Sequence, residues 1–187
     1  MKKVLGSIGV LVAVVHFSAT PAGATSIVVN GSFETGDLTG WTDGGNTGWN
    51  SVSSGAAAPG GGSFGIDNGA VGSFSTLSQT LTTTVGTPYT INFWFRNDGG
   101  GIFNLLFGGN VLYSESGLNH AYQFHTLVSP GAISTSTVLQ LQFRDDPGFV
   151  QFDNITVEAA VPEPATGLLL VTGLAALARR ARSTKRR

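Results

Sequence analysis

Two stretches of the chain carry side chains suited to holding a sugar. Trp94 and Arg96 occupy alternate positions of one stretch, and Gln140, Gln142 and Arg144 occupy alternate positions of the other. Sugars are commonly bound by an aromatic ring against their apolar C–H face and by amide or guanidinium donors to their hydroxyls. If the two stretches are strands of one sheet, the five side chains could share an outward face.

The same residues also have a purely structural interpretation. Trp94 could pack beneath the loop 99–101, and Trp41 could plug the end of the fold. Alternatively, Trp41 and Trp49, in the glycine-rich segment, could line a binding site at the loop end of the domain. Both arginines could pair with nearby acids, which are Asp98, Asp145 and Asp146.

Residues suited to catalysis are few. His120 and His125 are five positions apart, which would place them on opposite faces of one strand. No nucleophile-elbow motif marks a serine, and the glycine run 60–62 lacks the lysine of a phosphate-binding loop. The sequence therefore predicts a protein that is not an enzyme, with a glycan-acting hydrolase as a weak alternative.

The elements that must position these side chains follow a period of two, which is typical of β-strands with one buried face. Residues 89–96 and 138–144 alternate most clearly, and Gly108-Gly109-Asn110 separates two further apolar runs as a hairpin turn would. Other expected elements are strands at 77–81 and 122–128, a turn at 86–88 and a loop at 55–65. Six to nine short strands predict an all-β antiparallel sandwich, of the jelly-roll kind.

Both ends of the chain have the character of processing segments. Lys2 and Lys3 precede the apolar stretch 4–17, and the small residues 22–24 suit signal peptidase, so residues 1–24 are predicted to be a signal peptide. At the other end, Pro162-Glu163-Pro164 is followed by an apolar run, 165–178, and a basic tail, 179–187. The run is short for a membrane span but could cross a thinned bilayer, with the basic tail on the cytoplasmic side.

The remaining residues, 25–160, are expected to form one exported domain. Arg96 and Arg144 are its only Lys or Arg residues, whereas it holds ten acids, so its formal charge is −8. Such a charge disfavours nucleic acid and anionic lipid headgroups as partners. The chain has no cysteine, so the domain is expected to fold without disulfides.

The C-terminal segment resembles the PEP-CTERM sorting signal of Gram-negative bacteria that make extracellular polysaccharide. The resemblance rests on Pro162, Glu163 and Pro164, the short apolar run and the arginine-rich tail, in that order. It implies recognition by exosortase, a membrane protease, and only transient anchoring in the inner membrane. An ordinary C-terminal anchor or a helix lying on the membrane is the alternative.

The two ends of the domain resemble those of galactose-binding-like jelly rolls, including calcium-carrying carbohydrate-binding modules. The resemblance rests on the opening segment Asn30–Trp41 and the closing segment Phe152–Val157, both expected to be end strands. It implies a structural calcium ion held by Glu34 and Asp153, with Asp67 as a plausible third ligand. A break in the alternation of the closing segment predicts a bend at Asp153-Asn154. Alternatively, these acids are turn or capping residues.

Together these observations predict an exported carbohydrate-binding or adhesive module at the cell surface or in the exopolysaccharide matrix. The principal alternative is a structural or glycosylated matrix protein without specific sugar binding.

Overall fold

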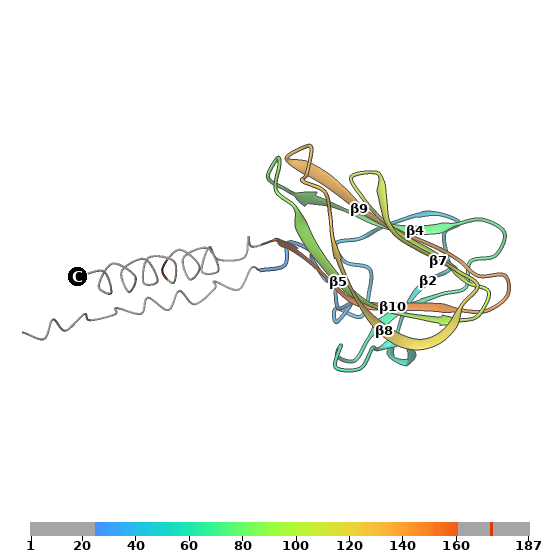
Figure 1. Ribbon diagram of the computed structural model, residues 1–187. Helices are drawn as coiled ribbons and strands as arrows, with labels where there is room; N and C mark the ends of the chain where they lie inside the picture. Colours follow the sequence, from blue (N-terminus) through green and yellow to red (C-terminus); the bar gives the residue numbers. More distant parts are fainter. Residues whose placement is uncertain (1–24, 161–172, 174–187) are drawn as a thin grey trace, which may run out of the picture.

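The computed structural model describes residues 25–160 and Gly173. Residues 25–160 form two five-stranded antiparallel sheets that pack face to face (Figure 1). Sheet A has the order β1 (Thr42–Gly45), β4 (Ser75–Thr82), β9 (Ser136–Arg144), β6 (Ile102–Phe107) and β7 (Asn110–Ser116). Sheet B has the order β2 (Asn50–Ser53), β3 (Gly65–Asn68), β10 (Val150–Ala159), β5 (Tyr89–Asp98) and β8 (Asn119–Val128). The predicted all-β antiparallel sandwich is confirmed, with ten strands in the described residues rather than the six to nine expected.

Aromatic side chains from both sheets build the core. The predicted inward positions of β5 and β9 are all buried: Tyr89, Ile91, Phe93, Phe95, Leu139, Leu141 and Phe143. Phe103 of β6 joins the two sets, because its ring lies 4.4 Å from that of Phe95 and 5.2 Å from that of Phe143. The alternation of each strand therefore turns its apolar side chains toward one shared core.

Strand β10 bends where its alternation breaks. Its pairing with β5 shifts register between Asp153 and Thr156, and Asn154 has a positive φ of 53°. The predicted bend at Asp153-Asn154 is therefore a β-bulge. The predicted hairpin is also present, since β6 and β7 pair antiparallel around Gly108 and Gly109.

The opening segment differs from the expectation, because residues 25–41 form turns rather than a strand. Asn30 and Phe33 have positive φ values of 50° and 55°, which interrupt any extended run. Phe33 and Trp41 are nonetheless buried, with ring centroids 5.7 Å apart, and the Trp41 indole donates to the carbonyl oxygen of Asn30. Trp41 therefore belongs to the core of the sandwich.

The glycine-rich segment before β3 lies against the outer face of sheet B. It begins with the 3₁₀ turn η1 (Ser54–Ala56). The Ala58 backbone N–H donates to the Asp153 carboxylate at 2.8 Å, and the Tyr122 hydroxyl donates to the Ala56 carbonyl at 2.6 Å. The segment is thereby fixed to both β10 and β8, and it forms one wall of the site described below.

The expected signal peptide (1–24), sorting motif (162–164), apolar helix (165–178) and basic tail (179–187) lie outside the described residues, apart from Gly173. Where the structure is described, we find no helix with the length and apolar character needed to cross a membrane.

Candidate functional site

The five predicted sugar-binding side chains do not share a face. Trp94 and Arg96 lie on β5 in sheet B, whereas Gln140, Gln142 and Arg144 lie on β9 in sheet A. Each set alternates with buried residues and so points away from the core, but the two sets face opposite sides of the sandwich. The prediction of one shared surface is wrong, because the two strands pair within different sheets.

An aromatic pair lies on the outer face of sheet B. Trp94 is directly paired with Phe124 of β8, and their ring centroids are 5.3 Å apart. Phe124 is 54% exposed, so its ring is open to solvent on the outer face of the edge strand β8. The sequence signal for it was the alternation of Tyr122, Phe124 and Thr126 along β8, which parallels that of Trp94 and Arg96.

A hollow of about 390 Å³ opens on the same sheet, where Arg96 and Tyr122 line it. The Gly-rich segment contributes Pro59, and the ends of β5 and β8 contribute polar groups. The full lining is Pro59, Arg96, Asp98, Asn119, His120, Ala121 and Tyr122. A concave site with a few fixed polar groups is the usual form of a small-molecule or oligosaccharide site.

A polar row crosses three strands at the edge of this hollow. Arg96 donates to Gln151 of β10 at 2.9 Å and forms an ion pair with Asp98 at 2.7 Å. Gln151 donates in turn to Asp67 of β3 at 3.4 Å. The pKa of Asp67 is raised overall, because the effect of burial outweighs that of the hydrogen bond from Gln151, which lowers it. The hydrogen bond to Gln151 and the ion pair with Asp98 thus hold the Arg96 guanidinium in one orientation.

The other predicted residues lie elsewhere. Trp49 is 45% exposed between β1 and β2, and β2 is at the opposite edge of sheet B from β8. Arg144 pairs with Asp146, as the structural interpretation predicted. Gln142 donates to Gln140 at 3.0 Å.

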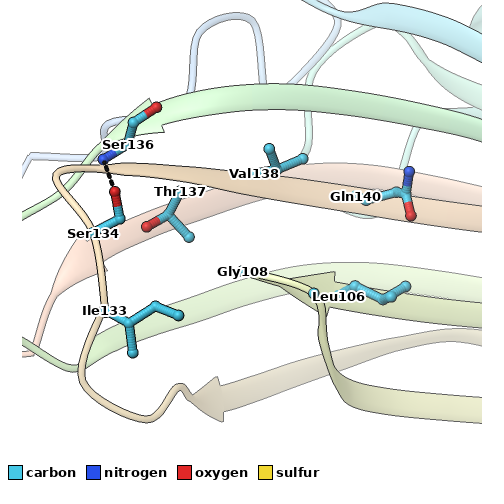
Figure 2. Close-up of a pocket in the computed structure, with 9 residues that line it drawn as sticks. Leu106, Gly108, Ile133, Ser134, Ser136, Thr137, Val138 and Gln140 are labelled. Atoms are coloured by element: carbon cyan, nitrogen blue, oxygen red, sulfur yellow. Dashed lines mark hydrogen bonds between the residues drawn. The ribbon is translucent and has the colours of Figure 1, made fainter.

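Gln140 lines a second hollow, of about 370 Å³, on the outer face of sheet A (Figure 2). Its wall is formed mainly by small and aliphatic residues, including Leu106, Val138 and Ile133, and Ile133 is 84% exposed. No aromatic or charged side chain belongs to the lining. This hollow therefore lacks the stacking platform that sugar binding commonly uses.

Two of the three predicted calcium ligands converge on the glycine-rich segment. The Glu34 carboxylate accepts from the backbone N–H groups of Ser63 and Phe64, each at 2.8 Å. Asp153 is fully buried and accepts from Ala58. Burial, reinforced by the nearby Glu34 charge, raises the pKa of Asp153 to about 7. Two carboxylates brought together with one of them buried would gain from a cation between them.

The backbone approaches these two carboxylates so closely that only glycine fits there. A Cβ at Gly61 would lie 2.2 Å from the Asp153 carboxylate, and one at Gly62 would lie 2.5 Å from the Glu34 carboxylate. Asp67 belongs instead to the Arg96 row, and Asp98 and Arg96 are the charges that affect its pKa. Across residues 25–160, no three acidic or histidine side chains gather as a metal-binding group. The chemistry of the site thus fits Glu34 and Asp153 but not Asp67.

The two histidines also differ from the expectation. A register shift between Phe95 and Asn97 turns both His120 and His125 toward the interior, so they lie on the same face. His120 contacts the Glu115 carboxylate at 2.8 Å. Burial would raise the pKa of Glu115, but hydrogen bonds from the residues around it lower it. The donors are Tyr113, His120 and Asn97. Glu115 and its three donors form a satisfied polar network, whereas Nε2 of His125 is buried without a hydrogen-bond partner among the described residues.

Comparison with known proteins identifies the C-terminal segment. Residues 160–183 match the family model of the PEP-CTERM protein-sorting motif. The chain thus carries the predicted sorting motif, which marks an exported, surface-directed protein. No curated protein matches this sequence.

Solved structures resemble the sandwich. TmCBM61, determined with β-1,4-galactotriose, has a TM-score of 0.62 and 17% identity over 72% of this chain and 99% of its own. The xylan-binding CBM22-1 domain of Paenibacillus barcinonensis Xyn10C has a TM-score of 0.56 and 18% identity over 75% of this chain and 99% of its own. The K3 adhesin domain of Lys-gingipain from Porphyromonas gingivalis has a TM-score of 0.54 and 13% identity over 71% of this chain and 99% of its own. At these identities the likeness establishes the fold, a jelly roll of the carbohydrate-binding-module type.

Proposed function

We propose that the mature domain is a carbohydrate-binding module that holds a neutral polysaccharide on the outer face of sheet B. One observation carries the proposal. The exposed Phe124 ring, packed on Trp94, lies on the same sheet as the hollow that Arg96 lines. The rings would lie against the C–H face of a sugar unit, and Arg96, Asp98 and Asn119 would bind its hydroxyls. The formal charge of −8 for residues 25–160 favours a neutral over an anionic glycan.

The sorting motif supports a role outside the cell. We infer that residues 1–24 are removed by signal peptidase and that an exosortase-like protease releases the domain from its transient inner-membrane tether at the C-terminus. The product would lie at the cell surface or in the extracellular polysaccharide of a Gram-negative host. That polysaccharide is then the natural ligand to test, beside the xylan and β-1,4-galactan suggested by the structural neighbours.

Replacing Phe124 tests the proposed face. We expect Phe124→Ala to weaken retention on the host polysaccharide, measured by affinity electrophoresis of the exported protein, about tenfold or more, as loss of a central aromatic contact does. Phe149→Ala is the matched control, because Phe149 is similarly exposed, at 49% against 54%, but lies in the loop before β10. Equal retention of both variants would contradict the proposed face, and absence of retention in the unaltered protein would favour the matrix-protein alternative.

We also propose that a calcium ion joins Glu34 and Asp153 and so fixes the glycine-rich segment against sheet B. Backbone carbonyl oxygens of that segment would complete its shell, since calcium takes six to eight oxygen ligands. The Asp153 carboxylate is buried without a basic partner in the described chain, and a cation would offset the cost of its charge. The same segment contributes Pro59 to the hollow, so the ion would support the binding face.

A further inference from the structure

A second buried carboxylate lies at the end of β9, outside both sites described above. Asp145 is 0% exposed, and neither of its carboxylate oxygens has a hydrogen-bond partner among the described residues. Its backbone N–H donates to the Ala70 carbonyl at 2.7 Å, which fixes its position between two loops. A buried polar group without a partner costs free energy and is rare in native proteins. The Asp145 side chain therefore calls for a ligand.

The space around this carboxylate is bordered by glycine and by oxygen. A Cβ at Gly148 would lie 2.9 Å from both Asp145 oxygens, and one at Gly101 would lie 3.1 Å from Oδ2. A Cβ at Gly100 would lie 3.5 Å from Oδ1 and 3.9 Å from the carbonyl oxygens of both Asp146 and Pro147. Beside Gly100, one Asp145 oxygen and the two carbonyl oxygens thus lie within 4 Å of a single point, whereas the Val150 side chain, at 2.3 Å, fills the corresponding point beside Gly101.

The nearby charges also favour a cation over a water molecule or an anion. The side-chain oxygen of Asn97 also lies beside Gly101, 2.7 Å from where its Cβ would be, but it already accepts hydrogen bonds from the backbone N–H groups of Gly99 and Gly101. Burial raises the pKa of Asp145, and the neighbouring charges of Asp146 and Asp98 raise it further. Arg96 and Arg144, the only Lys or Arg residues in 25–160, pair with Asp98 and Asp146. No lysine or arginine among residues 25–160 is therefore left to neutralise Asp145.

We propose that Asp145 and the carbonyl oxygens of Asp146 and Pro147 form a second calcium site, which ties together the loops 98–101 and 145–149. A carboxylate that can bind through both oxygens, supplemented by backbone carbonyls and water, is a typical calcium donor set. The site shares no ligand with the Glu34–Asp153 ion, and its loop 98–101 begins at Asp98, which also lines the proposed sugar hollow. It would lock the end of the sandwich at which β5, β6, β9 and β10 begin or end.

Calcium titration of the exported protein in a Glu34→Gln background isolates this site. Once bound calcium has been removed with a chelator, we expect isothermal titration to show that each chain binds one calcium ion. Adding calcium to about 100 times its Kd should raise the melting temperature by roughly 5–10 °C. Asp145→Asn in the same background should abolish both the binding and the shift, while its own melting temperature in EGTA should be equal to or above that of the Glu34→Gln parent.

Asp146→Asn is the matched control, because it removes the same charge from the next residue and keeps the backbone carbonyl that would bind the ion. It should retain one calcium per chain. The proposal is overturned if the Glu34→Gln protein binds no calcium, or if Asp145→Asn binds it as well as the parent does. Polysaccharide retention is measured separately, by the Phe124→Ala comparison.

Discussion

At the scale of single residues, similar sequence contexts lead to different roles. Arg96 and Arg144 each pair with an aspartate two positions later, and their side chains are 39% and 37% exposed. Arg96 is also tied to Gln151 beside a hollow, whereas Arg144 lies on the other side of the sandwich. The chemistry that a side chain can offer is therefore readable from sequence, but its companions are set by which strands pair.

Titration of Asp153 should make the stability of the domain depend on pH. The pKa of Asp153 is raised from 3.8 to about 7 in the folded state, so the folded protein holds a proton that the unfolded chain loses above pH 4. In EGTA, this group should lower the stability as pH rises from about 4 to 7. We expect Asp153→Asn, which stays neutral, to gain in melting temperature relative to the unaltered protein over that range.

Other groups titrate as well, so the comparison must be between variants. The pKa of Asp145 is also raised, which acts in the same direction, and burial lowers the pKa of His125, which acts in the opposite direction. Asp37→Asn is the control. Hydrogen bonding, chiefly from Thr39, lowers the pKa of Asp37, so its contribution to stability increases with pH instead of decreasing. A difference between Asp153→Asn and the parent that is the same at pH 4 and pH 8 would argue against a buried Asp153 charge.

At the scale of elements, the local pattern predicted more than the pairing did. The inward faces of β5 and β9, the β6–β7 hairpin and the bend in β10 all follow from alternation and turn chemistry within a few residues. The division of strands between sheets depends on contacts far apart in sequence, and so does the placement of residues 54–64 over sheet B. His120 and His125 face the same side of β8 because of a register shift opposite β5, and the residues there give no sequence signal for it. The candidate site was missed in part for this reason, since its walls come from three separate segments.

The glycine-rich segment provides a direct test of this packing. Gly61 has no positive φ, so the strain in Gly61→Ala comes from contacts, of which the nearest are the Asp153 carboxylate at 2.2 Å and the Ala58 carbonyl at 3.2 Å. We expect overpacking to destabilise the domain by about 1–3 kcal/mol, measured by urea unfolding. Gly55→Ala in the same segment is the control, because its Cβ would meet only the Ser53 hydroxyl at 3.5 Å. Equal stability of the two variants would show that the segment does not rest on Asp153.

At the scale of the whole molecule, the ends and the domain have opposite characters. The whole chain has a formal charge of −1, because the basic residues at its two ends offset the −8 of residues 25–160. Six of the basic residues follow the Pro162-Glu163-Pro164 motif, within the segment that matches the PEP-CTERM model or directly after it. A basic end favours retention on the cytoplasmic side, whereas an acidic, cysteine-free domain is compatible with release. The charge distribution therefore matches a protein whose two parts are separated after export.

Replacing all three motif residues by alanine should block that separation. Two prolines fix φ, remove two N–H donors and disfavour helix at the preceding residues, so we expect the motif to present an extended backbone to a protease. Alanine, the strongest helix former, would allow a helix to continue through it. In the native host, we expect the triple variant to stay in the membrane fraction with its basic tail, detected by mass spectrometry of the intact protein. Glu158→Ala, on β10 just before the motif, should be released as the unaltered protein is; release of the triple variant with the same C-terminus would contradict processing at this motif.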